Sequence, residues 1–401
     1  MKYKLKRLRI LITICIALIV IVSCSTNSSM KANNNEYDHY NSIDSVIGDS
    51  YYGASSNPTN NPIGGGKGYN YTVTPLDADF IVYNDTQLIA TLNIATNGQT
   101  IFIPGNVEIV LTGKDHIVIP GNVEIDLTGK DHIVIPAGVT LASDRGKWNS
   151  IGALIYTNDS INGPQYPNFG LFHPQENVRI TGLRIRGPDG KRRYQAYDPD
   201  TTTSYGIYCS DCNLEIDNCE ISNWTRAAIF LTYGATNAKI HHNYFHNIQR
   251  TGLGYGIYVN NFCDVLVEAN IFDSTRHVVA GSGMSNASYE ACYNIILEGC
   301  NNGHNFDMHG YGNTSPIAGN IIIIHHNTVF VDHYVDWENN PQERPSVCIR
   351  GTPITGCWVY NNWFYKEKDS YPPPVQQWNG NGNMYVFKNW YGKRTPAMPY
   401  K

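Results

Sequence analysis

Charged side chains are scarce in this chain of 401 residues: they make up 16% of it, whereas hydrophobic residues make up 42%. A chain this apolar is not disordered throughout, and it is long enough to bury a core. Alternating Glu and Lys runs are also few, while the chain holds 36 Gly and 28 Tyr. These proportions are typical of strands and turns, so they exclude a helical bundle or a coiled coil.

One apolar run, residues 11–22, follows a basic N-terminus and is shorter than the ~20 residues that a membrane-spanning helix prefers. Residues 1–23 are therefore interpreted as a signal peptide. The ending Ile21-Val22-Ser23-Cys24 resembles the bacterial lipobox. The resemblance implies a secreted lipoprotein whose Cys24 carries the lipid, held extracytoplasmically at the bacterial cell envelope and touching the membrane only through that lipid. An ordinary signal peptide or an uncleaved anchor is the alternative.

Positive charge is scarcer still without residues 1–23, because the 29 Lys and Arg fall to 24 against 34 Asp and Glu, a net charge of −10. This balance disfavours nucleic acid as a partner. Eight cysteines follow Cys24, but Cys209-x-x-Cys212 lacks a second Cys or His pair at zinc spacing. Packed or disulfide-bonded thiols are therefore expected. No tight Asp and Glu cluster indicates calcium either, so cofactor and metal stay unknown.

The chain divides into a leader, a linker and one folded domain. Residues 24–72 are rich in Ser, Asn, Gly and Tyr and lack an apolar period, which predicts a flexible tether. Ordered structure is predicted over 73–401. Near its start, Leu88, Ile89 and Leu92 have helical spacing, so residues 85–92 are predicted to form a short N-terminal capping helix.

Two kinds of repeat follow. Residues 105–120 recur at 121–136, and only Val110, which corresponds to Asp126, differs. The second copy is predicted to lead in register into residues 137–141, and the first to form a strand pair near the N-terminal end of the domain. A weaker repeat, with an Asn between apolar pairs, recurs every 24 to 35 residues. Its members are Cys219, Asn243, Asn270, Cys300, Asn327, Asn362 and Asn389. Such steps predict a stacked parallel solenoid with these Asn in one column.

The segments TNGQTIFIPGNV and GVTLASDRG, with the repeating GIY and NxF units, resemble the right-handed parallel β-helix, or pectin-lyase-like, superfamily over residues 80–391. The resemblance implies an all-β, right-handed parallel β-helix, although no diagnostic lyase signature is present. A sandwich or propeller is the runner-up, but the Asn-Gly hairpin turns that it needs are scarce.

One strand of each repeat carries the candidate site. With Ile257, Val279, Met308 and Ile349 pointing inward, alternation places Tyr258, Ala280, His309, Arg350 and Asp307 on the outer surface. Longer segments at 279–300 and 308–327 predict inserted loops there, where functional residues are commonly placed. The candidate catalytic residues are Asp307, His309, Arg350, Arg276, His277, Tyr289 and Glu290, and the candidate substrate-binding residues are Tyr258, His304, Lys191, Arg192 and Arg193.

Each candidate has a structural alternative. Arg276 and His277 would then brace a loop, Asp307 would fix His309, and Lys191 to Arg193 would be a solvated face. The paired histidines His241, His242, His325 and His326 are interpreted as exposed turn residues.

These residues fit three reaction classes. Uronate β-elimination needs a cation at the substrate carboxylate, a base and an acid, roles open to Arg350 or Arg276, His309 or His277, and Tyr289 or Tyr258. Glycoside hydrolysis needs two carboxyl groups, for which only Asp307 with Glu290 is nominated. The favoured hypothesis is a monomeric polysaccharide lyase acting on a uronic-acid-containing glycan. A glycoside hydrolase, a uronate epimerase and a non-catalytic glycan-binding lipoprotein are the alternatives.

Overall fold

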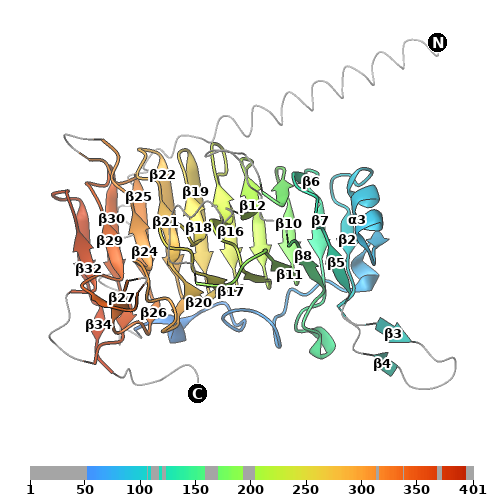
Figure 1. Ribbon diagram of the computed structural model, residues 1–401, viewed down its shortest axis with the longest axis horizontal. Helices are drawn as coiled ribbons and strands as arrows, with labels where there is room; N and C mark the ends of the chain where they lie inside the picture. The colour runs from blue at the N-terminus through green and yellow to red at the C-terminus, as the bar shows by residue number, and fades with distance from the viewer. Residues whose placement is uncertain are drawn as a thin grey trace, which may run out of the picture. The chain divides into compact units, whose positions relative to one another are not determined.

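The computed structural model describes residues 52–105, 123–158, 170–192, 204–312, 316–336, 338–367 and 373–393, and the backbone alone of 107–109 and 117–119. The predicted signal peptide, Cys24 and residues 24–51 of the predicted tether lie outside these residues. The described strands form three long sheets whose neighbouring strands are parallel, and the chain visits the sheets in turn (Figure 1). None of the helices described has both the length and the apolar character needed to cross a membrane.

The three sheets are named here by number, and their strands are given in spatial order. Sheet 1 holds β1 (Phe80–Ile81), β2 (Thr100–Phe102), β7 (Thr140–Ala142), β10 (Arg179–Thr181), β13 (Glu215–Asp217), β16 (Ala238–His241), β19 (Cys263–Glu268), β22 (Ala287–Cys292), β25 (Ile321–His325), β30 (Gly356–Tyr360) and β33 (Met384–Phe387). Sheet 2 holds β34 (Trp390–Tyr391), β31 (Trp363–Phe364), β26 (Thr328–Val329), β23 (Ile295–Ile296), β20 (Ile271–Thr275), β17 (Tyr244–Ile248), β14 (Glu220–Ser222), β11 (Arg184–Arg186), β8 (Leu154–Tyr156) and β5 (Glu124–Asp126). Sheet 3 holds β32 (Val375–Gln377), β29 (Val347–Ile349), β24 (Phe306–Met308), β21 (His277–Gly281), β18 (Tyr255–Val259), β15 (Ala227–Leu231), β12 (Tyr205–Cys209), β9 (Phe172–Pro174) and β6 (Ile133–Ile135).

The remaining elements are short. They are the helix α3 (Asp85–Leu92), the 3₁₀ turns η2 (Ala54–Ser56), η3 (Pro75–Asp77) and η4 (Lys147–Asn149), and the antiparallel pairs β3 (Val107–Ile109) with β4 (Ile117–Ile119) and β27 (Tyr334–Val335) with β28 (Pro341–Gln342).

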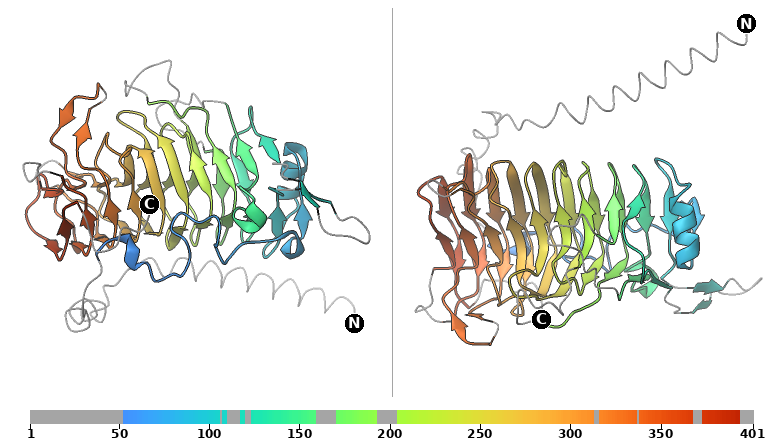
Figure 2. Two further views of the ribbon diagram at one scale, coloured as in Figure 1. Left: turned by 90° about the horizontal axis from the view of Figure 1, so that it is seen from below. Right: turned by 45° about the horizontal axis from the view of Figure 1, so that its top comes forward.

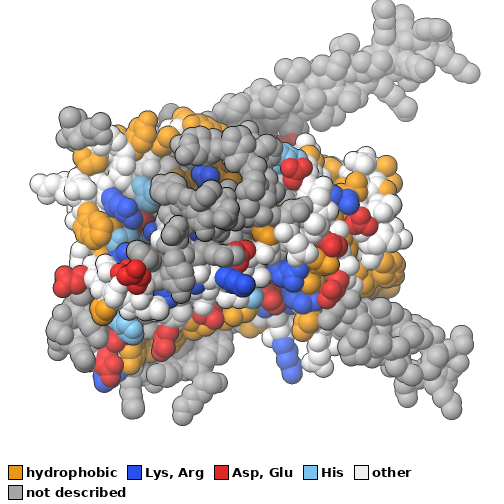
Figure 3. Space-filling view, in the orientation of Figure 1, with side chains coloured by type: hydrophobic (Ala, Val, Ile, Leu, Met, Phe, Trp, Pro, Cys, Tyr) orange, Lys and Arg blue, Asp and Glu red, His pale blue; other side chains and the backbone are white. Residues whose placement is uncertain are grey.

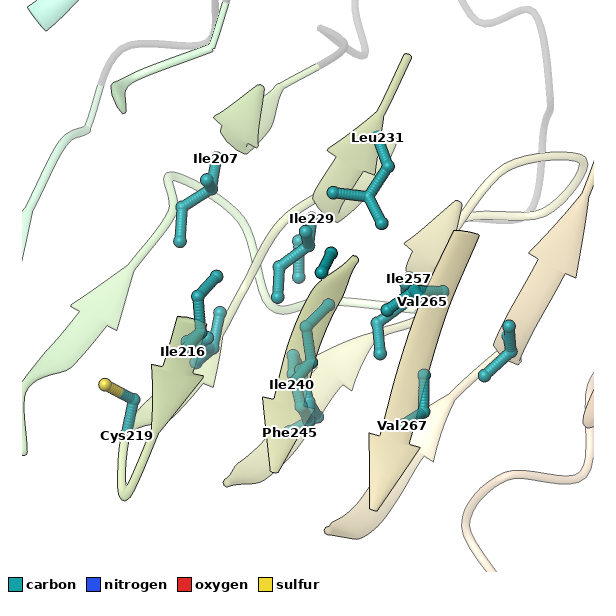
Figure 4. Close-up of a cluster of buried hydrophobic side chains, with 14 of the residues drawn as sticks. Ile207, Ile216, Cys219, Ile229, Leu231, Ile240, Phe245, Ile257, Val265 and Val267 are labelled. Atoms are coloured by element: carbon teal, nitrogen blue, oxygen red, sulfur yellow. The ribbon is translucent and has the colours of Figure 1, made fainter. Parts of the chain in front are cut away.

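The core consists of apolar rows along the stack, because each strand directs alternate side chains inward. In sheet 3, Ile207 pairs with Ile229 and Ile229 with Ile257, and all three are fully buried (Figure 4). The rings of Phe245 and Phe272 stack 4.8 Å between centroids, close to the spacing of neighbouring strands. The predicted parallel β-helix is therefore confirmed.

Helix α3 lies where the sequence predicts it and covers the N-terminal end of the core (Figure 1). The side chain of Asn84 accepts a hydrogen bond from the backbone N–H of Gln87, which satisfies one of the free donors at the helix start. Leu88 and Leu92 are buried against the first coils. The helix therefore shields apolar side chains that have no preceding coil to cover them.

The predicted Asn column is present, with one correction. The side-chain oxygens of Asn243, Asn270, Asn294, Asn327, Asn362 and Asn389 each accept a hydrogen bond from the backbone N–H of the preceding member, beginning at Cys219. Asn294, rather than the predicted Cys300, occupies the rung between Asn270 and Asn327. The reason is the strand pairing, which aligns Ile271 with Ile295.

Residues 52–72 correct the prediction of a flexible tether, because they lie along the corner between sheets 1 and 2 (Figure 2). The backbone N–H of Ala54 donates to Oγ1 of Thr328, and that of Gly64 donates to the Ala269 carbonyl. Gly65 has a φ of +68°, and a Cβ there would lie 2.3 Å from the His242 carbonyl oxygen, so only glycine fits this approach. Hydrogen bonds to distant residues hold this polar segment, together with isolated apolar contacts of Ala54 and Ile63, so its sequence shows no apolar period.

The N-terminal segment also covers His242, which the sequence analysis placed in an exposed turn. His242 is 3% exposed and accepts from or donates to Oγ1 of Thr59 over 2.9 Å. Burial, and then the charge of His241, lowers the pKa of His242 to about 4, and burial with the charge of His325 lowers that of His326 to about 3. Both rings are therefore neutral in the folded protein at neutral pH.

We expect these two histidines to make the fold acid-sensitive. Their folded pKa values lie below the unfolded value near 6.5, so the stability is complete above about pH 6.5 and is lost as the pH falls toward 4. Each ring contributes about 1.4 kcal/mol per pH unit to this slope. Urea unfolding between pH 7 and 4.5 measures it. His242→Asn places at this position the residue type that the preceding coil has at Asn218. The variant should reduce the slope of the unfolding free energy against pH by one proton. An unchanged slope would show that His242 does not cause the acid sensitivity.

The duplicated block adopts two structures. Its second copy supplies β5 and β6, which pair in parallel with β8 and β9, and leads into β7 as predicted. Its first copy supplies β3 and β4, which pair with each other in antiparallel fashion and project from the stack (Figure 1). The same local sequence thus forms a coil where a neighbouring coil is available and a hairpin where it is not.

Deleting residues 105–120 should therefore leave the fold nearly intact. The deletion joins Pro104 to Gly121, which can replace Gly105 as the donor to the Asp144 carboxylate. A hairpin outside the stack supplies little of the contact between neighbouring repeats that stabilises a solenoid. Thermal unfolding of the deletion variant tests this, and a collapse of its Tm would show that the hairpin is integral to the stack.

Candidate functional site

A row of stacked rings follows the outer face of sheet 3. The ring centroids lie 4.7 Å apart from His132 to His173, 5.2 Å from His173 to Tyr208, 5.2 Å from Tyr208 to Phe230 and 5.0 Å from Phe230 to Tyr258. The row ends at Ala280, the register partner of Tyr258. From His173 to Tyr258 it forms because successive strands of sheet 3 place a ring at one outward position, whereas His132 reaches the row from the residue before β6.

Asp307 occupies the outward position that follows Ala280, and it is completely buried. Arg350 donates to both of its oxygens, from Nε over 3.0 Å and from Nη2 over 2.6 Å. Nε2 of His309 lies 3.2 Å from Oδ2 of Asp307. His309 and Arg350 follow β24 and β29, neighbouring strands, and their side chains are 29% and 32% exposed. Figure 3 shows His and basic side chains together over this end of sheet 3.

The network keeps Asp307 ionised. Burial alone would raise the pKa of this carboxyl, but the hydrogen bond from His309 and the charges of His277, His309 and Arg350 lower the pKa well below its usual value. Burial works against the charge of Arg350, yet Asp307 raises the pKa of its guanidinium. A fixed carboxylate that accepts from Nε2–H of His309 leaves the lone pair on Nδ1, so His309 has the tautomer of a general base.

Three other predicted residues lie beneath this surface. His277 is 1% exposed and donates from Nδ1 to the His304 carbonyl, and burial lowers its pKa well below the usual value. Burial likewise lowers the pKa of His304 to about 4, and its Nδ1 donates to the Pro345 carbonyl. Arg276 donates to the Leu253 carbonyl. All three side chains hold backbone carbonyls of neighbouring turns, which is the kind of contact that the structural alternative gives to Arg276 and His277.

Tyr289 and Glu290 do not overhang the site, which corrects the predicted loop. Both belong to β22 of sheet 1. Tyr289 points into the core and is 2% exposed, while Glu290 lies on the outer face of sheet 1 beside His325. The predicted loop depended on placing Cys300 in the Asn column. With Asn294 in that position, the segment that begins at Val279 is shorter, and most of the predicted insertion disappears.

The assumed strand register contains a related error. Val279 pairs with Phe306, and Met308 pairs with Gly281 on one side and with Ile349 on the other. Asp307 therefore takes the position next to Ala280 that had been given to His309. His309 and Arg350 still follow one another on neighbouring coils, since Met308 and Ile349 are partners.

Lys191 and Arg192, in the basic run after β11, make their hydrogen bonds to residues outside the Asp307 network. Arg192 donates to the side chain of Asn339 and to the Asp336 carbonyl, and the backbone N–H of Lys191 donates to Asp189. Arg193 lies outside the described residues. These contacts connect two surface loops.

Sequence reasoning missed several residues of this face. The rings of His132, His173, Tyr208 and Phe230 extend the row that Tyr258 ends, and the inward-outward alternation that located Tyr258 would have found Tyr208 and Phe230. Trp378 was missed as well. Its ring lies 5.9 Å from the Arg350 guanidinium and packs edge-on against His304.

A separate hollow of about 310 Å³ lies near the C-terminal coils. It is lined by residues in and around β27 and β28 and by residues that follow β31, including Tyr334, Arg344 and Tyr365. None of the predicted site residues lines it, so the chemistry of the Asp307 network does not depend on it.

Comparison with known proteins agrees with this architecture. A family model described as the right handed beta helix region matches residues 171–365, which include Asp307, His309 and Arg350. No curated protein matches the chain in sequence. The parallel sheets, the stacked Asn column and this match together show that the chain folds as a right-handed parallel β-helix.

Proposed function

We propose that this protein acts on a polysaccharide, and that it is a lyase that cleaves a uronic-acid-containing glycan by β-elimination. The observation that supports this is the position of the Asp307, His309 and Arg350 network at the end of a row of stacked rings. The rings stack on one another, so the row turns their edges outward and offers an apolar strip along which an extended sugar chain can lie. The network would then act on the sugar unit beyond the row.

The residues divide the reaction between them. His309, oriented by Asp307, removes the proton beside the uronate carboxylate through Nδ1. Arg350 stabilises the charge that then develops on that carboxylate. Tyr258 is the candidate acid for the leaving oxygen, because burial raises its pKa and keeps the phenol protonated. Tyr289, the other candidate acid, is excluded by its burial.

The local charge suits an anionic substrate. Burial, and then the charges of Arg344 and Arg350, lower the pKa of Arg276, and burial with the charge of Arg350 lowers that of Arg344, so the three guanidinium groups lie near one another. Two carboxylates, Asp307 and Asp336, act on these three groups. Three guanidinium groups thus gather beside the network, although the chain as a whole is acidic.

Hydrolysis through the nominated carboxyl pair is disfavoured. Asp307 belongs to sheet 3 and Glu290 to the outer face of sheet 1, so the two do not flank one glycosidic bond. Asp307 is also fully buried and ionised, whereas an acid catalyst must carry a proton. A uronate epimerase would use the same base and the same cation. A non-catalytic protein would use only the row of rings, to bind the glycan.

A panel of acidic and neutral glycans distinguishes these functions. A lyase produces absorbance of the unsaturated uronate, a hydrolase produces reducing ends without it, an epimerase changes the C5 configuration with neither, and a binding protein only retains the glycan. We expect unsaturated product from a uronate polymer and none from a neutral glycan. Reducing ends without absorbance would overturn the proposal.

We also propose that Cys24 is the lipidated N-terminus of the mature protein at the cell envelope. Intact mass spectrometry of protein purified from membranes tests this. A chain that begins at residue 24 with added acyl mass is expected, and an unmodified Cys24 would overturn the proposal.

A further inference from the structure

A mixed set of metal-ligand side chains lies on the outer face of sheet 1, away from Asp307. Glu290 and Cys292 project from the same face of β22, two residues apart, and His325 is the register partner of Cys292 on β25. One ligand atom from each lies within 4.8 Å of the others. Cys292 is 3% exposed and His325 is 8% exposed, while Glu290 is half-buried.

A matched set three coils nearer the N-terminal end shows what this one lacks. Glu215, Asp217 and His241 repeat the arrangement, with Nε2 of His241 3.1 Å from Glu215 and Nε2 of His325 2.9 Å from Glu290. In that set the guanidinium of Arg179 donates to both oxygens of Asp217. Among the described residues, no Lys or Arg forms an ion pair with Glu290.

The negative charge around Cys292 is therefore poorly compensated. Glu268 is the register partner of Cys292 on the other side, so a second carboxylate lies on the neighbouring coil. A bound divalent cation would compensate these carboxylates, and it would deprotonate a coordinating thiol.

The surroundings of His325 fit a metal ligand. Its ring stacks on Tyr360 at 5.0 Å, which fixes its plane. Its Nδ1 lies 2.6 Å from Nδ1 of His326, and Nε2 of His326 lies 3.2 Å from the Asn361 amide nitrogen. Metal-bound histidines commonly have such a partner on the second ring nitrogen.

Asn361 allows the ring protons of His325 and His326 to take the positions that metal binding at Nε2 of His325 requires. Its Oδ1 is buried and receives no hydrogen bond from the described residues, so it is available to accept from His326 once the amide turns over. His326 would then accept from Nδ1–H of His325. The lone pair of His325 Nε2 would face Glu290 and Cys292, a direction that favours a cation between them.

We propose that Glu290, Cys292 and His325 bind one Zn²⁺ ion and so join β22 to β25. A thiolate, an imidazole and a carboxylate are zinc ligands, and water or Glu268 would complete the tetrahedron. Tetrahedral coordination places such ligand atoms roughly 3.3–3.5 Å apart. The three atoms already lie within 4.8 Å of one another, and those of His325 and Glu290 lie 2.9 Å apart, so small side-chain rotations are the adjustment that an ion requires.

Cobalt provides the test, since Co²⁺ substitutes for Zn²⁺ and reports a thiolate ligand by a near-ultraviolet charge-transfer band. The full chain, stripped with a chelator, is titrated with CoCl₂ and then with ZnCl₂. We expect one equivalent of Co²⁺ to give the band and Zn²⁺ to abolish it. His326→Gln, which removes the support of His325, should weaken the affinity by about 10- to 100-fold.

The variants locate the site. Cys292→Ser should lose the band, and Glu290→Gln, at a half-buried position that tolerates the change, should weaken Co²⁺ binding at least 10-fold while near-ultraviolet circular dichroism stays native. The matched Glu215→Gln variant should bind as the parent does. Absence of the band in the folded parent protein, its persistence in Cys292→Ser, or equal loss in Glu215→Gln would each overturn the proposal.

Discussion

His309→Ala is expected to lower the turnover of the cleaved uronate polymer by about 10²- to 10⁴-fold, the range typical of losing a general acid or base. The loss should fall on kcat, because His309 takes part in proton transfer and the row of rings still binds the glycan. Absorbance of the unsaturated product at saturating substrate measures it. This prediction depends on the proposed lyase function.

A matched histidine serves as the control. His246 also pairs with a carboxylate, Nε2 lying 3.2 Å from Glu220, but it belongs to sheet 2. His246→Ala should retain parental turnover. Equal losses in the two variants would indicate general destabilisation, and an unchanged rate in His309→Ala would return His309 to a structural role.

Much of the fold was predictable because its signals are local and repeated. Each coil reuses an apolar pair around an Asn, so Asn243, Asn270 and Asn327 identify the stack without any knowledge of distant contacts. The same alternation placed His309 and Arg350 on one outer face. These predictions depend only on the period of two in a strand, which holds wherever the strand is straight.

The failures share a different physical cause. Asn294 was missed because Cys300 also lies at an acceptable repeat length from Asn270 and Asn327. Only the pairing of Ile271 with Ile295 shows that Asn294 occupies the column. Because of that error, the sequence analysis assigned Glu290 to an inserted loop, whereas Glu290 lies in β22 of sheet 1. The N-terminal segment was missed because its contacts are backbone hydrogen bonds to residues far along the chain, and such bonds leave no apolar period in the sequence.

Asn294→Ala is expected to destabilise the protein by about 3–5 kcal/mol, because it leaves several buried groups without partners. Oδ1 of Asn294 accepts from both the backbone and the side-chain nitrogen of Asn270. Its Nδ2 donates to the Val267 carbonyl and to Oδ1 of Asn327. All of these Asn side chains are fully buried, so water cannot replace the lost bonds. Equilibrium urea unfolding measures the change.

The end of the column provides the internal control. Asn389 is half-buried and lies in the last described coil, so Asn389→Ala should cost only about 1 kcal/mol, since water can enter the space of the lost side chain and bond the freed groups. Cys300→Ala tests the register directly. The Cys300 sulfur accepts one long hydrogen bond of 3.5 Å from the Thr275 backbone, so its removal costs little beyond a small cavity, about 1–2 kcal/mol. A larger loss for Cys300→Ala than for Asn294→Ala would move the rung back to Cys300, and with it the whole arrangement of β22.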